Sequence, residues 1–151
     1  MSGQSRQQFK SAVWIIFKNE NDEILLIRRK NTGWRDGEYA LPAGHIDPHE
    51  TAIQACVHEA REEVGLEIST DDLKLVHVMQ CEPVVKEDDN FINLYFSCER
   101  WGGVAIIGEP EKCDDLIWVA SKDFDQIPVI NTVRKAIEHI EHDESLSFYG
   151  F

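Results

Sequence analysis

The stretch at residues 44–66, GHIDPHETAIQACVHEAREEVGL, constrains the fold and the chemistry of this chain more than any other part of the sequence. Thr51 and Gln54 have the spacing of a capping box, in which each side chain bonds a backbone N–H at the start of a helix. Gly65 suits the left-handed residue that commonly ends a helix. The sequence therefore predicts one helix between these signals.

One side of the predicted helix is apolar and its neighbouring side is acidic. The apolar stripe consists of Ile53, Val57, Ala60 and Val64, and this spacing predicts a face that packs on a core. Glu59 and Glu63 lie one turn apart, with Glu62 next to Glu59. Like charges at this spacing destabilise an isolated helix by roughly 0.2–0.5 kcal/mol, and the negative end of the helix dipole also disfavours them.

A bound cation would remove this cost, and Mg²⁺, which prefers oxygen ligands, is the natural candidate. The alternative is an acidic helix end that faces water. The surrounding residues favour the cation, because the stretch resembles the signature box of the Nudix hydrolases. That box reads Gly, five residues, Glu, seven residues, then Arg-Glu-aliphatic-any-Glu-Glu-any-Gly-aliphatic. The matching residues are Gly44, Glu50, Glu59, Ala60, Glu62, Glu63, Gly65 and Leu66. His58 departs from the pattern, because it stands where the family usually has Arg.

The resemblance implies an α/β fold of the Nudix type: an α/β/α sandwich with a mixed β-sheet and the box loop and helix on one side. Segments rich in β-formers predict strands at 9–18, 23–29, 73–82, 91–99 and 114–120, with a short extended segment at 39–43. The first two strands are expected to form a hairpin, and residues 83–90 to connect another. A second helix is predicted at 131–142, with Asn131 as its N-cap.

The length and charge of the chain limit what it can bind. With 151 residues it is expected to form a single domain over 1–151, with 1–8 frayed. The net charge of −13 argues against a duplex nucleic-acid partner, while a small phosphate substrate stays compatible because a bound divalent cation inverts the local field. The aromatic tail at 145–151 packs either on the domain or on a partner, so a homodimer remains open.

The sequence also predicts the compartment. No run approaches the ~20 apolar residues of a membrane span, and the N-terminus lacks the apolar segment of a secretory signal, so a cytoplasmic protein without a membrane partner is expected. The widely spaced cysteines are then expected to be reduced and mostly buried; they are Cys56, Cys81, Cys98 and Cys113.

The resemblance further implies metal-dependent hydrolysis of the pyrophosphate linkage in a nucleoside diphosphate bonded to another group. A nucleoside triphosphate, cleaved to monophosphate and pyrophosphate, is the first expectation for this small-molecule nucleotide substrate. ADP-ribose, or another nucleotide sugar or dinucleotide, is the alternative. A non-catalytic nucleotide-sensing Nudix domain is a second alternative, and the retention of all four box glutamates favours the enzyme.

The family match also implies roles for individual residues. Glu59 and Glu63, assisted by Glu62, would bind Mg²⁺, with Mn²⁺ as a substitute. The backbone carbonyl of Ala43 would join them, although many relatives have Gly there. The proton of the attacking water would go to Glu59 or to a glutamate outside the box. The candidates outside the box are Glu109 and Glu111, and Glu111 is included among the predicted catalytic residues.

Substrate-binding residues are expected in the loops around the box. Arg28, Arg29 and Lys112 are candidates for binding phosphates. Trp34 either stacks on a base or covers the edge of the core.

Three histidines crowd the box, and one of them replaces the usual Arg. His58 either orients Glu59 with a hydrogen bond that depends on pH or points to solvent. A zinc site formed by His45, His49 and His58 is conceivable, but their spacing matches no known zinc pattern.

Overall fold

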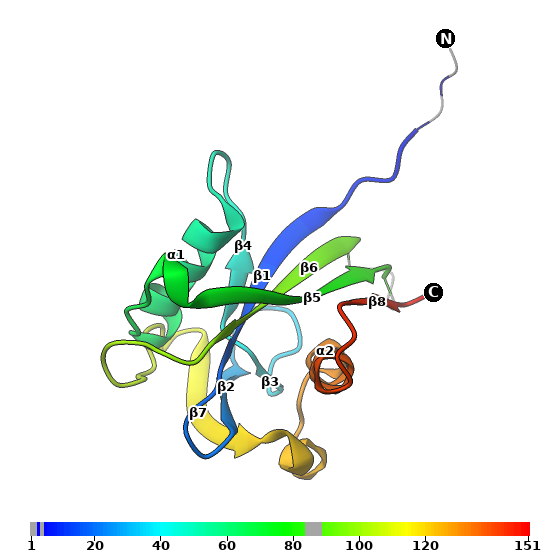
Figure 1. Ribbon diagram of the computed structural model, residues 1–151. Helices are drawn as coiled ribbons and strands as arrows, with labels where there is room; N and C mark the ends of the chain where they lie inside the picture. The colour runs from blue at the N-terminus through cyan, green and yellow to red at the C-terminus, as the bar shows by residue number, and fades with distance from the viewer. Residues whose placement is uncertain (1–2, 4, 84–88) are drawn as a thin grey trace.

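The computed structural model describes residues 3, 5–83 and 89–151. Figure 1 shows α1 on one side of the β-structure and α2 on the other, as expected for an α/β/α sandwich. The elements in chain order are β1 (Lys10–Phe17), β2 (Glu23–Arg29), β3 (Tyr39–Ala40), β4 (Ala43–His45), α1 (Ala52–Val64), η1 (Thr70–Asp72), β5 (Leu73–Cys81), β6 (Phe91–Cys98), β7 (Cys113–Ala120), η2 (Ser121–Gln126), α2 (Asn131–Glu141) and β8 (Leu146–Tyr149).

The strands form two sheets. The larger sheet has the order β4-β1-β6-β5-β8 and is mixed, because β1 pairs in parallel with β6 and antiparallel with β4, while β5 pairs antiparallel with β6 and in parallel with β8. The smaller sheet has the order β3-β2-β7 and is antiparallel. The predicted mixed sheet is confirmed.

The predicted hairpin between the first two strands is wrong. β1 and β2 lie in different sheets. An isolated antiparallel bridge joins Lys18, the residue after β1, to Ile24 of β2. Both strands are apolar on both faces, and each needs cover on two sides, which a two-stranded hairpin cannot provide. β2 is instead buried on both faces, with Ile24 and Leu26 in one apolar cluster and Leu25 in another, and its backbone pairs with β7 in the register Leu25 opposite Trp118.

The C-terminal tail forms β8, a strand that the sequence did not predict. It is held by His77 of β5, whose side chain is 1% exposed. The Nδ1 atom of His77 donates to the Glu144 carbonyl at 2.7 Å, and its Nε2 atom lies 2.7 Å from the Ser147 hydroxyl. The tail therefore packs on its own domain.

The predicted N-cap of the second helix is also wrong. Ile130 occupies the N-cap position and makes no side-chain capping bond, while Asn131 is the first helical residue. The side-chain amide of Asn131 instead donates a 2.7 Å hydrogen bond to the Tyr149 hydroxyl of β8. Tertiary contact with the tail thus outweighs the local capping preference.

Two apolar clusters lie on the two sides of the large sheet. One joins α1 to β1 and β6, and includes Val13, Ile15, Phe17, Cys56, Ala60 and Phe96. The other joins the sheet to β2 and α2, and includes Trp14, Leu26, Tyr95, Val133 and Ile137. The four cysteines are unpaired and buried, as predicted. Residues 84–88 of the predicted hairpin connection lie outside the described residues.

Candidate active site

The predicted box helix forms with the expected ends. Thr51 accepts from the backbone N–H of Gln54 at 3.1 Å, and the Gln54 side chain accepts from the backbone N–H of Thr51 at 2.8 Å. Gly65 has a φ of 68° and its N–H bonds the Arg61 carbonyl. The helix therefore begins and ends where the local signals predicted.

The helix is rotated relative to the predicted apolar stripe. Its fully buried residues are Ala55, Cys56, Ala60 and Val64, whereas Ile53 and Val57 are only half-buried. The small residues Ala55 and Cys56 allow a close approach to the sheet, and this brings the adjacent Glu59 and Glu63 inward. The carboxylates of Glu59 and Glu63 are therefore partly buried at the edge of the core.

A second segment, the loop at residues 101–112, closes the C-terminal end of α1. The N–H of Ile106 bonds the Val64 carbonyl at 3.0 Å, and the N–H of Gly108 bonds the Glu63 carbonyl at 2.9 Å. A Cβ on Gly108 would lie 2.1 Å from the Glu62 carbonyl oxygen, so this approach requires glycine. The free carbonyls of the last helical turn are satisfied in this way, and Glu109 is carried to the box.

β4 provides the opposite wall of the site. It pairs with β1 so that Val13 lies opposite Gly44 and Trp14 lies opposite Ala43. Because hydrogen-bonded and non-hydrogen-bonded pairs alternate along an antiparallel ladder, the N–H and the carbonyl of Ala43 point away from β1. The N–H of Ala43 donates to the Glu63 carboxylate at 3.1 Å. A Cβ on Gly44 would lie 2.2 Å from the Glu59 carboxyl carbon. The glycine of the box is therefore required for the Glu59 carboxylate to approach the strand.

The environment of these carboxylates disfavours their negative charge. Burial raises the pKa of Glu59 to about 7, and the neighbouring Glu62 and Glu109 carboxylates add to the rise. Burial also raises the pKa of Glu63 well above its ordinary value, assisted by the charges of Glu59 and Glu109. Glu63 lines the cavity, but its carboxyl group is largely shielded from solvent. A countercharge at this position would stabilise the ionised form of both groups.

This donor set fits a hard divalent cation. Carboxylate oxygens and a backbone carbonyl that faces the same space are ligands that Mg²⁺ and Mn²⁺ accept. The close approach of Glu59 to Gly44 and the hydrogen bond from the Ala43 N–H to Glu63 bring both carboxylates to the same strand. The residues present therefore fit the metal that the sequence implied.

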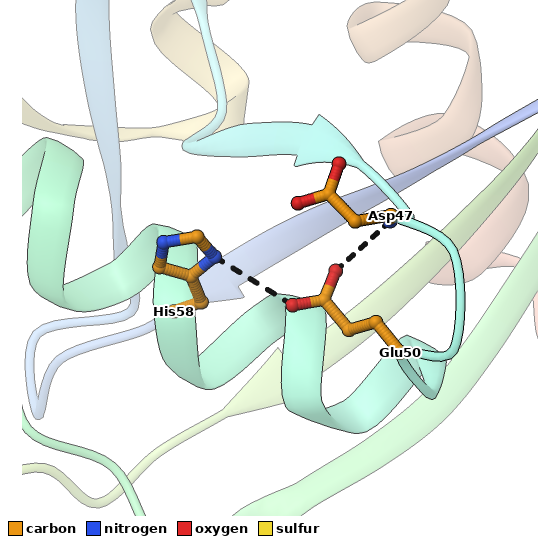
Figure 2. A group of neighbouring side chains, drawn as sticks. All are labelled: Asp47, Glu50 and His58. Carbon is orange, nitrogen blue, oxygen red and sulfur yellow. Dashed lines mark hydrogen bonds and ion pairs between the residues drawn. The ribbon is translucent and has the colours of Figure 1, made fainter.

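His58 does not contact Glu59 as a hydrogen-bond partner. Its Nε2 atom lies 2.8 Å from the Glu62 carboxylate, and its Nδ1 atom lies 3.6 Å from Glu50. Figure 2 shows the imidazole turned toward Glu50, which in turn accepts from the backbone N–H of Asp47 at 3.0 Å. The hydrogen bond to Glu62 raises the pKa of His58. The predicted contact with Glu59 is wrong, and so is the alternative in which His58 points only to solvent.

His45 and His49 do not join His58 in a possible metal site. Among the described residues, the side chains close enough to share an ion near His58 are Asp47 with Glu50, and Glu59 with Glu62. The three-histidine zinc site considered from the sequence is therefore not assembled.

A cavity of about 760 Å³ opens in front of the carboxylates. Four glutamates line one end of it: Glu59, Glu62, Glu63 and Glu109. Arg29 and Lys112 also line it, and Lys112 lies 3.9 Å from Glu109. The cavity thus places negative groups for a cation next to positive groups for a phosphate.

Trp34 lines the cavity and also packs against the core. The Nε atom of Arg29 donates to the Trp34 carbonyl at 2.7 Å, and the guanidinium carbon lies 4.8 Å from the centre of the Trp34 ring. This stacking holds both side chains at the cavity mouth.

The structure leaves two predicted site residues outside this cavity. Arg28 bonds Asp114 at 2.6 Å on the opposite side of its strand and is not among the cavity residues. Glu111 is exposed and does not line the cavity either, unlike Glu109. The alternation of side chains along β2 explains why Arg29 and not its neighbour reaches the site.

Several polar residues of the cavity were not predicted from the sequence. Asn93 comes from the middle of β6, while Asn131 and Tyr149 come from α2 and β8. No local motif marks these positions, because the fold alone brings the three elements to one cavity.

Comparison with known proteins agrees with this geometry. The family model described as the NUDIX domain matches residues 8–140 of this chain. An 8-oxo-dGTP diphosphatase of Escherichia coli strain K12 is 33% identical over 112 residues, which cover 72% of this chain and 82% of that protein. The 8-oxo-dGDP phosphatase NUDT18 of Mus musculus is 33% identical over 97 residues, 61% of this chain, and the match spans only 26% of the mouse protein.

A solved structure shows the same fold. The crystal structure of a MutT NUDIX hydrolase from Burkholderia pseudomallei matches with a TM-score of 0.77 and 24% identity, covering 87% of this chain and 98% of that one. Among the described residues, no helix has both the length and the apolar composition needed to cross a membrane. The box residues, their assembly around one cavity and these matches together place the chain in the Nudix hydrolase family.

Proposed function

We propose that this protein is a metal-dependent nucleotide pyrophosphohydrolase whose substrate is a nucleoside triphosphate, cleaved to monophosphate and pyrophosphate. One observation carries the proposal: Glu59, Glu62 and Glu63 from α1 meet Glu109 from a separate loop at one end of a cavity that also holds cationic and aromatic side chains. The names of the E. coli and mouse relatives, which act on 8-oxo-dGTP and 8-oxo-dGDP, support a nucleotide with a phosphate chain.

Glu59 and Glu63, with Glu62 and the carbonyl of Ala43, would hold the divalent cation. When bound, such a cation neutralises phosphate charge and lowers the pKa of a coordinated water. Arg29 and Lys112 bind phosphate oxygens of the substrate, and their positive charge helps to position the linkage.

Glu109 is the proposed general base, in place of Glu111. A water oxygen attacks phosphorus, a proton of that water passes to Glu109, and the bridging P–O bond breaks with its electron pair on the leaving phosphate. Glu109 suits this role because it lines the cavity and its charge acts on both Glu59 and Glu63. Its N-terminal neighbour Gly108 is fixed to the Glu63 carbonyl, which sets the distance between base and metal ligands.

The experiment is a hydrolysis panel followed by ³¹P NMR. The substrates are the common nucleoside triphosphates, 8-oxo-dGTP, 8-oxo-dGDP and ADP-ribose, each with Mg²⁺, with Mn²⁺ and with EDTA. The expected result is release of pyrophosphate from a triphosphate, dependent on the cation. Cleavage of ADP-ribose alone would replace the substrate class, and binding without turnover of any nucleotide would make the protein a sensor.

A further inference from the structure

Arg29 is a half-buried cation at the end of β2, on the wall of the cavity. Burial lowers the pKa of its guanidinium, while the nearby charge of Glu63 opposes this effect. Among the described residues, Arg29 lies in no salt bridge with a carboxylate. Its side-chain hydrogen bonds go instead to the loop at 30–38, which leads from β2 to β3. Because a buried charge without an ion pair depends on hydrogen bonds, this loop determines how the cation is held.

Two of the three guanidinium nitrogens are bound to the loop. The Nε atom of Arg29 donates to the Trp34 carbonyl at 2.7 Å, and its Nη2 atom donates to the Thr32 hydroxyl at 2.9 Å. The Nη1 atom makes no hydrogen bond within the described part of the chain. The donors of a guanidinium form a rigid planar fork, so two bound nitrogens fix the direction of the third. Nη1 is therefore the nitrogen left for a ligand.

The Thr32 hydroxyl connects Arg29 to a carboxylate. It lies 2.6 Å from the Asp36 Oδ1 atom and accepts from the Trp34 backbone N–H at 3.2 Å. A hydroxyl has one proton and two lone pairs. Donation of that proton to Asp36 leaves the lone pairs for Arg29 and for the Trp34 N–H. The carboxylate of Asp36 thus sets the direction of the hydroxyl that holds the guanidinium.

Asp36 also fixes the backbone of the loop. Its carboxylate accepts from the N–H of Thr32 and from the N–H of Gly33, each at 3.0 Å. The loop backbone is left-handed at Gly33, with a φ of 83°, and at Arg35, with a φ of 51°. Such a conformation is uncommon for a residue other than glycine and persists where the surroundings enforce it. These hydrogen bonds, chiefly the one from the Thr32 side chain, lower the pKa of Asp36.

We propose that Thr32 and Asp36 are positioning residues, which hold the Arg29 guanidinium so that its Nη1 edge meets a phosphate group of the ligand. This inference rests on the proposed function, in which Arg29 binds a phosphate oxygen. Asp36 is exposed and does not line the cavity, so it acts through Thr32 and the loop. Its own negative charge opposes the binding of an anion. Positioning and simple electrostatics therefore predict opposite effects when Asp36 is removed.

The test measures the binding of inorganic pyrophosphate in the presence of Mg²⁺ by calorimetry, because this probe carries phosphate groups and no base. We expect Asp36→Ala to weaken binding by about fivefold or more, whereas the loss of a negative charge alone would strengthen it. Thr32→Val, which removes the hydroxyl, should have the same effect. Thr32→Ser, which keeps it, should stay within about twofold of the wild type. Thermal melting of each variant checks that the fold is intact.

A double-mutant cycle separates positioning from general damage to the loop. Arg29→Met removes the guanidinium and is expected to weaken binding by about tenfold or more. In that background, Asp36→Ala and Thr32→Val should change the Kd by less than about twofold, because positioning needs a guanidinium to act on. Equal effects of Asp36→Ala in both backgrounds would overturn the inference. So would unchanged or tighter binding by Asp36→Ala in the wild-type background, which decides the matter even if Arg29→Met binds too weakly to measure.

The results distinguish this inference from the proposed function, because pyrophosphate binding requires no turnover. If the wild type hydrolyses no nucleotide but Arg29 and Asp36 are coupled, the proposed function fails and the positioning role stands. If the wild type hydrolyses triphosphates but the two effects are additive, the positioning role fails and the proposed function stands. A wild type that does not bind pyrophosphate with Mg²⁺ would overturn the positioning role as well.

Discussion

At the level of single residues, the chemistry of this protein depends on which carboxylates the fold carries into the cavity. Glu109 and Glu111 have the same side chain and are two positions apart, yet only Glu109 lines the cavity. The hydrogen bond from Gly108 to Glu63 fixes this choice. Loop geometry of this kind has no signature in the sequence, which is why the sequence alone predicted Glu111 rather than Glu109 among the catalytic residues.

The Glu109→Gln substitution tests the choice against a matched control in the same loop. We expect Glu109→Gln to lower kcat at least tenfold, a loss of about 1.4 kcal/mol of transition-state stabilisation, because an amide cannot accept the proton of the attacking water. Glu111→Gln should keep kcat within about twofold of the wild type. Steady-state kinetics of both variants decide the matter, and the reverse order of effects would restore Glu111 as the base.

His58 gives the site a dependence on pH that an Arg would not. Its hydrogen bond to Glu62 raises its pKa above the ordinary 6.5. The ion pair between protonated His58 and Glu62 is therefore fully present below pH 6.5 and is lost as the pH rises through the higher folded-state pKa. Arg stays charged throughout this range. We expect the ratio of kcat/KM for His58→Arg to that for the wild type to increase with alkaline pH. A ratio that stays constant from pH 6 to pH 9 would show that this contact does not affect the reaction.

At the level of elements, the loop at 101–112 and α1 act as one unit. The loop satisfies the carbonyls at the end of α1, and it comes close enough to require glycine at 108. Its position therefore affects both stability and the placement of Glu109.

A pair of glycine substitutions in this loop separates close packing from general loop effects. Gly108→Ala places a Cβ 2.1 Å from the Glu62 carbonyl oxygen, whereas Gly102→Ala finds its nearest neighbour at 3.8 Å. We expect Gly108→Ala to lower both Tm and kcat, and Gly102→Ala to leave both nearly unchanged. Equal melting temperatures and activities for the two variants would contradict the close contact between loop and helix.

The attachment of β8 depends on a neutral histidine. Burial lowers the pKa of His77, with a further contribution from the adjacent His139, whose ring stacks on it at 5.5 Å. Because the folded-state pKa of His77 lies below the ordinary 6.5, the stability that neutral His77 contributes is fully present above pH 6.5. It is lost as the pH falls through the folded-state pKa.

We therefore expect His77→Gln to show a smaller loss of Tm between pH 7 and pH 5 than the wild type, although its Tm at pH 7 is lower. Thermal melting by circular dichroism at several pH values measures this. His49→Asn, at an exposed position of the box loop, is the control and should keep the wild-type dependence on pH. An unchanged slope in His77→Gln would show that other groups govern the acid stability.

At the level of the whole molecule, the features encoded locally were predicted and those set by tertiary packing were not. The capping box, Gly65 and most strand positions depend on residues close in sequence, and they are confirmed. The pairing of β2 with β7, the rotation of α1 and the strand β8 depend on which surfaces must be covered. Asn131 shows the same limit, because its bond to Tyr149 joins two elements that only the folded chain brings together.

The central claim is that Glu59 and Glu63 hold a divalent cation that makes this cavity a pyrophosphohydrolase. The most direct measurement is the turnover of a nucleoside triphosphate by Glu63→Gln, with Mg²⁺-dependent thermal stabilisation recorded on the same samples. We predict a loss of kcat greater than tenfold, an intact fold, and a smaller rise of Tm on addition of Mg²⁺ than in the wild type. A Glu63→Gln protein that keeps more than about a tenth of the wild-type kcat and the full metal-dependent rise of Tm would contradict the claim.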